Sequence, residues 1–221
     1  MNNPNFDLLM FARGPLFDLA LLVFLAGVLI RVVEIVVLGR KKDFSKAKGK
    51  PVQQGIKTIF TRTVPRPGAI KANPITIVGG YVFHIGFFIA FLLFVPHIAL
   101  IEELTGLSWP GVGRVIIESA TVLAVIAGLA LLYTRWKDPV RRKLTTWVDY
   151  LVLVLSLLPL ITGYIAVNKL FGDPTFMMAL HILSVDILMI VFPFTKLMHA
   201  FTFAMARYYN GSIQGRKGAE S

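Results

Sequence analysis

Five long apolar stretches divide this chain, and they constrain its fold more than any other feature of the sequence. They run over about residues 16–38, 77–100, 113–133, 147–167 and 176–203. Each is long enough to cross the roughly 30 Å hydrocarbon core of a bilayer as an α-helix. None shows the two-residue alternation of a barrel strand, and a backbone in lipid must satisfy its own hydrogen bonds. We therefore predict an all-α integral membrane protein, a five-helix transmembrane bundle that forms a single membrane domain over residues 1–221.

The composition agrees with this prediction and narrows the chemistry. Hydrophobic residues make up 56% of the chain, and the mean hydropathy of +0.70 exceeds that of a soluble domain of this size. The first stretch is too long, and too closely followed by charges, for a cleaved signal peptide. The chain has no cysteine, which excludes an iron–sulfur cluster, a c-type haem attachment and a thiolate zinc site within it.

The positive charges lie unevenly on the segments between the stretches. The net charge is +11, and the loop over residues 40–73 alone holds ten Lys and Arg residues, whereas the opposite side of the membrane receives Arg13, Arg114 and Lys169. By the positive-inside rule, the N-terminus lies outside and the C-terminus is cytoplasmic. The basic excess is mainly an orientation signal, with attraction to anionic membrane lipid or a cytosolic partner. It does not indicate nucleic-acid binding, because no basic stripe lies on a soluble fold.

The long basic loop contains one segment with the pattern of a helix. VQQGIKTIF, residues 52–60, is a candidate short interfacial helix. The loop is longer than a connection requires. Two interpretations therefore stay open: a segment that holds a partner protein, and a flexible loop attracted to lipid.

All four histidines lie in two of the five stretches, His84 and His97 in the second and His181 and His199 in the fifth. A histidine inside a membrane is costly and commonly marks function. His181 and His199 are 18 residues apart, so on one unbroken helix both would leave the same face about 27 Å apart. The second stretch runs outward and the fifth runs back. This topology pairs His84 with His199 near the inner face and His97 with His181 near the outer face.

Each histidine pair suits the two axial positions of a b-type haem in a helix bundle. With both positions filled, the iron transfers electrons and binds no substrate. His97 follows His84 by 13 residues, about 220° around an ideal helix. The two histidines therefore share a face only if the chain is redirected, and Pro96 is placed to kink the helix there.

Cations near the membrane faces are candidate partners of haem propionates. They are Arg31, Lys143 and Lys196 on the inner side and Arg114 on the outer side. Each also has a structural interpretation, since a long cation can extend its charge to the interface. Arg31 in particular lies three residues before Glu34, at ion-pair spacing on one helix face.

Two other classes of function remain open. The histidines could form a proton or ion relay with Glu34 and Asp186 in a transporter, or the chain could be a structural anchor for a cytosolic complex. Asp186 lies mid-membrane without an evident partner, where a protonated, hydrogen-bonded acid and a proton relay both account for it. Haem absorbance separates these classes from an electron-transfer subunit.

Four segments resemble the gamma subunit of respiratory nitrate reductase. They are FLAGVLIR (24–31), VFHIGFF (82–88), DPVRRKLTTWVDYLVLVLSLLPLITG (138–163) and FPFTKLMHAF (192–201). The likeness extends to membrane cytochromes that serve heterodisulfide-reductase-like iron–sulfur subunits. It implies a dihaem cytochrome b subunit in the inner membrane of a prokaryotic cell. Such a subunit exchanges electrons between menaquinone or ubiquinone and cytoplasmic iron–sulfur and catalytic subunits.

The resemblance also implies the ligands residue by residue. His84 and His199 would bind the inner haem, and His181 would be one ligand of the outer haem. In the family the second histidine of this stretch follows the first by ten residues, a position that is Phe94 here. Either His97 takes its place, or the protein carries one haem only.

Overall fold

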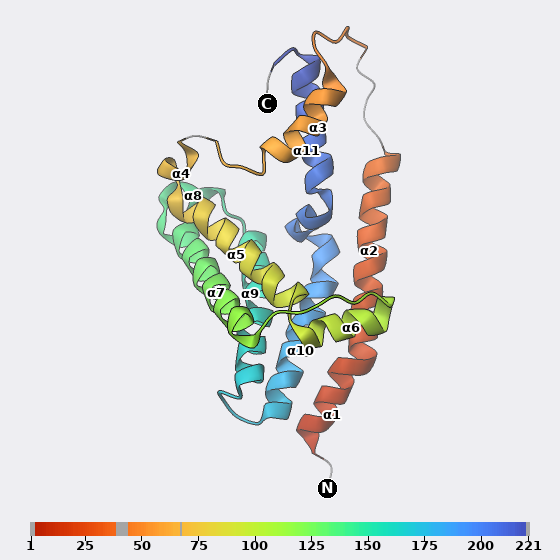
Figure 1. Ribbon diagram of the computed structural model, residues 1–221, viewed down its shortest axis with the longest axis vertical. Coiled ribbons are helices and arrows are strands. Elements are labelled where there is room, and N and C mark those ends of the chain that lie inside the picture. Colours follow the sequence, from red (N-terminus) through yellow and green to blue (C-terminus); the bar gives the residue numbers. More distant parts are fainter. Residues whose placement is uncertain (1–2, 39–43, 67, 220–221) are drawn as a thin grey trace. The chain divides into compact units, whose positions relative to one another are not determined.

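The structure, a computed structural model, describes residues 3–38, 44–66 and 68–219 (Figure 1). These residues form helices, turns and loops and contain no strand. Five helical segments are long and apolar enough to cross a membrane: Pro4–Val37, Pro74–Leu92, Arg114–Lys137, Trp147–Asn168 and Pro174–Phe194. The all-α fold with five spans is therefore confirmed, and the chain is a multi-pass membrane protein. Its orientation in the membrane stays a prediction.

The chain divides into two compact units. Unit 1 comprises Met1–Leu21 and Asn73–Ile190, and unit 2 comprises Leu22–Ala72 and Val191–Ser221. The helices of unit 1 are α1 (Pro4–Phe11), a π-helical turn (Ala12–Leu16), the start of α2 (Phe17–Val37), α5 (Pro74–Leu92), α6 (Val95–Thr105), α7 (Arg114–Lys137), α8 (Pro139–Leu144), α9 (Trp147–Asn168) and α10 (Pro174–Val191). The helices of unit 2 are the rest of α2, α3 (Pro51–Thr61), α4 (Ala69–Ala72), two 3-10 turns (Phe192–Phe194 and Lys196–Met198) and α11 (His199–Arg216).

Unit 1 is built on α7, which packs against both α5 and α9 (Figure 1). Gly86 of α5 lies directly on the α7 backbone, where a Cβ atom would be 2.5 Å from the Ala120 carbonyl oxygen and 2.8 Å from Ala124 Cβ. Gly128 of α7 makes similar room for the Leu157 side chain of α9. Small residues let helices approach closely in lipid, where dispersion rather than the hydrophobic effect holds them together.

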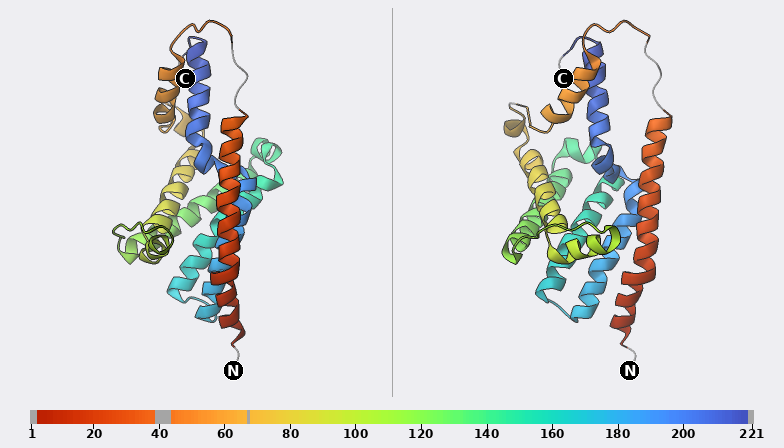
Figure 2. Two further views of the ribbon diagram at one scale, coloured as in Figure 1. Left: turned by 90° about the vertical axis from the view of Figure 1, so that its right-hand side faces the viewer. Right: turned by 45° about the vertical axis from the view of Figure 1, so that its right-hand side comes forward.

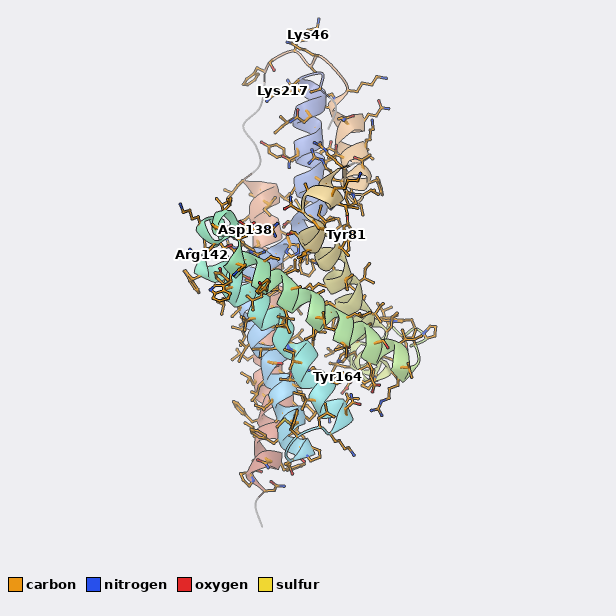
Figure 3. The ribbon with its side chains drawn as sticks, turned by 90° about the vertical axis from the view of Figure 1, so that its left-hand side faces the viewer. Lys46, Tyr81, Asp138, Arg142, Tyr164 and Lys217 are labelled. Carbon is orange, nitrogen blue, oxygen red and sulfur yellow. The ribbon has the colours of Figure 1, made fainter. Side chains whose placement is uncertain are left out.

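Polar side chains fix the end of unit 1 where α7, α8 and α5 meet. The Asp138 carboxylate caps α8 by accepting hydrogen bonds from the backbone of Val140 at 2.9 Å and of Arg141 at 3.2 Å. Arg141 donates to Asn73 at 2.6 Å and also to Thr76, which ties α8 to the start of α5. Figure 3 shows Asp138 at this end, with Tyr164 further along the unit. The sequence predicts that this end faces the cytoplasm.

The second span is broken just before His97, as Pro96 predicts. The helix α5 ends at Leu92, Phe94 has an extended backbone, and α6 then begins at Val95. The carbonyl groups released by the break find new donors: Trp109 Nε1 donates to the Leu92 oxygen at 2.6 Å, and the Val112 N–H donates to the Leu93 oxygen at 3.0 Å. Because its backbone groups are satisfied, the break is a well-formed corner.

The fifth span departs from the prediction of one unbroken helix. The helix α10 ends at Val191, two 3-10 turns follow, and α11 begins at His199. Pro193 explains the break, because its ring has no N–H to donate and clashes with the preceding turn. Its ring packs against α2, where a Cβ on Gly27 would be 2.5 Å from Pro193 Cγ. The prediction that His181 and His199 leave one face of one helix is therefore wrong.

Unit 2 contains a close helix pair, with α3 alongside α11 (Figure 2). Glycines bring the two backbones together: a Cβ on Gly55 would be 2.7 Å from the Tyr208 ring, and one on Gly211 would be 2.6 Å from the Gln54 carbonyl oxygen. Thr58 is fully buried between the helices. The helix predicted within residues 52–60 is therefore confirmed.

Hydrogen bonds complete the α3–α11 pair. Arg207 of α11 donates to the Ile59 carbonyl oxygen at 3.1 Å and to Thr63 Oγ1 at 2.8 Å. The Lys48 N–H donates to the Arg216 carbonyl oxygen at 2.9 Å, which holds the segment leading into α3 against the end of α11. Arg40, Lys41 and Lys42, which belong to the predicted basic loop, lie outside the described residues.

Candidate metal centre

The structure brings His97 and His181 together within unit 1, as the predicted topology requires. The centroids of the two imidazole rings are 6.1 Å apart, and their planes differ by 23°. His97 lies in the first turn of α6, and His181 lies within α10. The corner between α5 and α6 is what turns His97 toward α10.

The rings are stacked, and only the distance between their centroids is comparable with that of two imidazoles on opposite sides of one metal ion. A bond from an imidazole nitrogen to a metal is about 2.0–2.1 Å, and the nitrogen lies about 1.1 Å from the ring centroid, so the two centroids would be about 6.3 Å apart. An ordinary aromatic pair has centroids at similar distances, about 4.5–7 Å. The hydrogen bonds of the two rings therefore decide what the pair can bind.

His97 is held in the form that can ligate a metal through Nε2. Its Nδ1 atom lies 3.0 Å from the Ala90 carbonyl oxygen. A carbonyl only accepts, so Nδ1 carries the proton and the lone pair is on Nε2.

His181 has the equivalent arrangement with a side-chain acceptor. Its Nδ1 atom lies 3.4 Å from Thr162 Oγ1, and that hydroxyl donates its own hydrogen to the Leu158 carbonyl oxygen at 2.7 Å. Thr162 therefore accepts from the imidazole, which again leaves the lone pair on Nε2. Histidines that ligate metals commonly donate their second N–H to an oxygen acceptor in this way.

A glycine of α9 makes room for the His181 ring. A Cβ on Gly163 would be 2.9 Å from His181 Cε1 and 3.1 Å from its Nδ1. Ser184 Oγ lies 3.1 Å from Thr162 Oγ1, which links α10 to α9 beside the ring. No sequence pattern singles out Thr162 or Gly163, although both close the segment 138–163 that carries the family resemblance.

The other two histidines show the same tautomer. His84 Nδ1 lies 2.7 Å from the Gly80 carbonyl oxygen, and His199 Nδ1 lies 2.7 Å from the Lys196 carbonyl oxygen. All four imidazoles in the chain thus direct Nδ1 to an oxygen acceptor. His84 belongs to unit 1 and His199 to unit 2, so their pairing stays a prediction.

The candidate propionate partners have protein partners of their own. Arg31 pairs with Glu34 at 2.9 Å, which confirms the predicted ion pair, and its Nε donates to the Pro193 carbonyl oxygen at 3.4 Å. Arg114 donates to Glu118 at 2.6 Å and to Asn168 at 2.9 Å, which ties the start of α7 to the end of α9. Contacts of these arginines, or of Lys196, with a propionate stay predictions.

Asp186 is fully buried within α10, and among the described residues neither of its carboxyl oxygens has a hydrogen-bond partner. The interpretation as a hydrogen-bonded acid therefore finds no partner in that part of the chain. In the same described part, no three His, Cys, Asp or Glu side chains are grouped to hold a metal ion. A haem would need only two protein ligands, because the porphyrin supplies the other four.

Comparison with known proteins gives a family. A protein of Nitratidesulfovibrio vulgaris (strain Hildenborough), whose name is simply Protein, is 30% identical over 203 residues, which cover 89% of each chain. The chain belongs to the family of this protein. No family model matches the chain. The two sequences are similar over nearly their full length. Because the relative's name states no activity, the similarity indicates neither a ligand nor a reaction.

Proposed function

We propose that the protein is a b-type dihaem membrane subunit of a respiratory oxidoreductase in the inner membrane of a prokaryote. It exchanges electrons between the quinone pool and a cytoplasmic iron–sulfur or catalytic subunit. The observation that carries the proposal is the pair of His97 and His181, with ring centroids 6.1 Å apart and both Nδ1 atoms directed to oxygen acceptors. A haem held by this pair would supply one-electron transfer.

The residues around the pair have separate roles in this proposal. His97 and His181 would hold the outer haem, each through Nε2. The Ala90 carbonyl and Thr162 orient the two rings and keep the proton on Nδ1, and Gly163 leaves room for the second ring. His84 and His199, fixed by backbone carbonyls in the same tautomer, hold the inner haem.

The partners come from the resemblance to the nitrate reductase gamma subunit. It favours menaquinone or ubiquinone as the electron donor or acceptor in the membrane, and cytoplasmic iron–sulfur and catalytic subunits on the other side. The absence of cysteine supports this division, since any iron–sulfur cluster must be held by another chain.

Reduced-minus-oxidised spectra of the purified protein test the proposal. We expect the spectrum of b haem with two haems per chain. His97→Ala and His181→Ala should each remove the same haem, and His84→Ala and His199→Ala should each remove the other. Ser156→Ala, which changes a buried hydroxyl elsewhere on α9, is the matched control and should keep both. A protein without haem absorbance would end the proposal, and one haem per chain would reduce it to the one-haem alternative.

Asp186 favours a second candidate, a histidine-based proton or ion transporter. A fully buried carboxyl group without a hydrogen-bond partner is costly, and such groups in membranes commonly serve proton relays. This candidate predicts proton or ion flux in proteoliposomes that contain haem-free protein. The flux should be lost in Asp186→Asn. Electron transfer predicts no such flux and an unchanged haem spectrum in this variant.

A further inference from the structure

One face of α3 carries three exposed apolar side chains. Val52, Ile56 and Phe60 are 61%, 50% and 71% exposed. Their four-residue spacing places them in one stripe along the helix. The helix lies outside the five candidate spans, so the hydrocarbon core of the membrane does not account for this exposure. Contiguous apolar surface in water commonly marks an interaction site.

The apolar stripe is held in a fixed direction, away from α11. Gly55 and Thr58 form the opposite side of α3 and lie against Tyr208 and Gly211. At about 100° per residue, this side is centred about 130° from the stripe. Because the glycine contacts admit no side chain between the helices, α3 cannot rotate to bury Val52, Ile56 and Phe60 against α11.

The rigid support of α3 favours a protein as the occupant of the stripe. The surface beside the stripe, formed by Lys50, Pro51, Val52, Gln53 and Ile56, is a shallow, open depression. A preformed surface lowers the ordering cost of binding a protein partner. An interfacial helix in a bilayer needs no such support from a second helix.

The charge around the stripe is of one sign. Residues 44–72 contain seven Lys and Arg residues and no acidic residue, and residues 191–219 contain four and again no acidic residue. Lys50 and Lys57 are seven residues apart, which places both on one flank of the stripe. Lys46 and Lys217 lie at one end of the same unit in Figure 3. The complementary surface is therefore acidic.

We propose that Val52, Ile56 and Phe60, with Lys50 and Lys57 beside them, dock an acidic water-soluble protein. This inference rests on the proposed function and identifies that protein as the iron–sulfur partner subunit. The partner binds α3 through an apolar anchor and an acidic rim. Because α3 is packed on α11, which begins at His199, the docked subunit lies on the helix pair that carries a ligand of the proposed inner haem.

Site-specific photo-crosslinking in native membranes tests the docking surface. A photoreactive residue at position 60 should crosslink to one soluble protein that contains an iron–sulfur cluster. The same residue at position 61, the next residue of α3, should give at least tenfold less product. With the probe at position 56, Phe60→Glu should remove the crosslink, whereas Thr61→Glu adds the same charge off the stripe and should keep it.

Several outcomes overturn the inference. They are crosslinks from position 60 to phospholipid alone, to a second copy of this chain, or to a soluble protein without an iron–sulfur cluster, and equal products from positions 60 and 61. The haem spectrum of the same membranes separates the two proposals. Haem without a crosslink means that the docking surface is wrong. A crosslink without haem means that the electron-transfer function is wrong, and an unchanged haem spectrum in Phe60→Glu shows that the variant is folded.

Discussion

Two pairs of helices in this protein pack closely at glycines, but the groups around the two contacts differ. In unit 1, Gly86 brings α5 onto α7 against Ala120 and Ala124, and the neighbouring groups are apolar. In unit 2, Gly55 and Gly211 bring α3 onto α11, and hydrogen bonds from side chains such as Arg207 close the pair. The α5–α7 pair belongs to two candidate membrane spans, whereas α3 belongs to none.

The comparison shows when an exposed apolar side chain is informative. The outer surfaces of α5 and α7 carry many exposed apolar side chains, including Ile85 and Phe88, and lipid covers such surfaces in any membrane helix. On α3 the exposed apolar side chains form a stripe outside the spans, where water is the alternative neighbour. An interaction surface can therefore be inferred for α3 and not for α5 or α7.

The largest loss of stability is expected from a substitution in the α5–α7 pair. Gly86→Ala places a methyl group 2.5 Å from the Ala120 carbonyl oxygen, and overpacking of this kind costs about 1–3 kcal/mol. Gly79→Ala on the same helix meets Leu131 at an ordinary 3.5 Å and should change stability little. Thermal unfolding in detergent measures both variants. Equal melting temperatures would show that the α5–α7 contact is not a close one.

A smaller effect is expected when the α3–α11 pair is opened. Gly211→Ala brings a methyl group within 2.6 Å of the Gln54 carbonyl oxygen, which we expect to cost about 1–2 kcal/mol. Trypsin should then cut after Lys57 and Arg62 several times faster. The neighbouring Ser212→Ala is the control. If Gly86→Ala accelerates this cleavage equally, the two units do not pack independently.

A still smaller effect, on haem retention, is expected from a polar side chain inside unit 1. Thr162→Val keeps the shape of the side chain but removes the hydroxyl acceptor that lies 3.4 Å from His181 Nδ1. Loss of such an acceptor typically lowers metal affinity about 10- to 100-fold, and we expect the lower end because the contact is long. Haem retained after detergent washing measures the effect, with Ser156→Ala as control. Unchanged retention would show that Thr162 does not orient the ligand.

The smallest effect is expected for the exposed ion pair of unit 2. Arg31→Gln removes the contacts with Glu34 and with the Pro193 carbonyl oxygen. Arg31 lies near the end of a candidate span, where a long side chain can extend its charge to the interface, so the melting temperature should fall slightly. A large fall, or loss of the inner haem, would instead support the predicted role of Arg31 as a propionate partner.

The sequence predicted the spans well because the thickness of a bilayer sets their length. It also predicted the corner before His97, where Pro96 gave the signal. Pro193 is the same kind of signal within the fifth span. The five-turn spacing of His181 and His199 places both on one face only if the helix is unbroken. The structure shows that the helix is broken between them.

The residues that support the candidate metal centre were harder to predict. In a membrane helix the buried and lipid-facing sides are both apolar, so hydrophobic periodicity does not show which side meets a neighbour. Thr162 and Gly163 gain their meaning only from the packing of α9 on α10, which places them against the His181 ring. No spacing rule within one helix contains that information.

The corner between α5 and α6 has a consequence for how such proteins vary. On a continuous helix, each inserted residue would swing a following side chain by about 100°. Here Trp109 and Val112 bind the carbonyl groups of the corner, so the direction of the His97 side chain depends on the local turn rather than on helical phase. Insertions or deletions before the corner can be absorbed there. Different separations of the two histidines in this stretch are therefore compatible with the same geometry at His181.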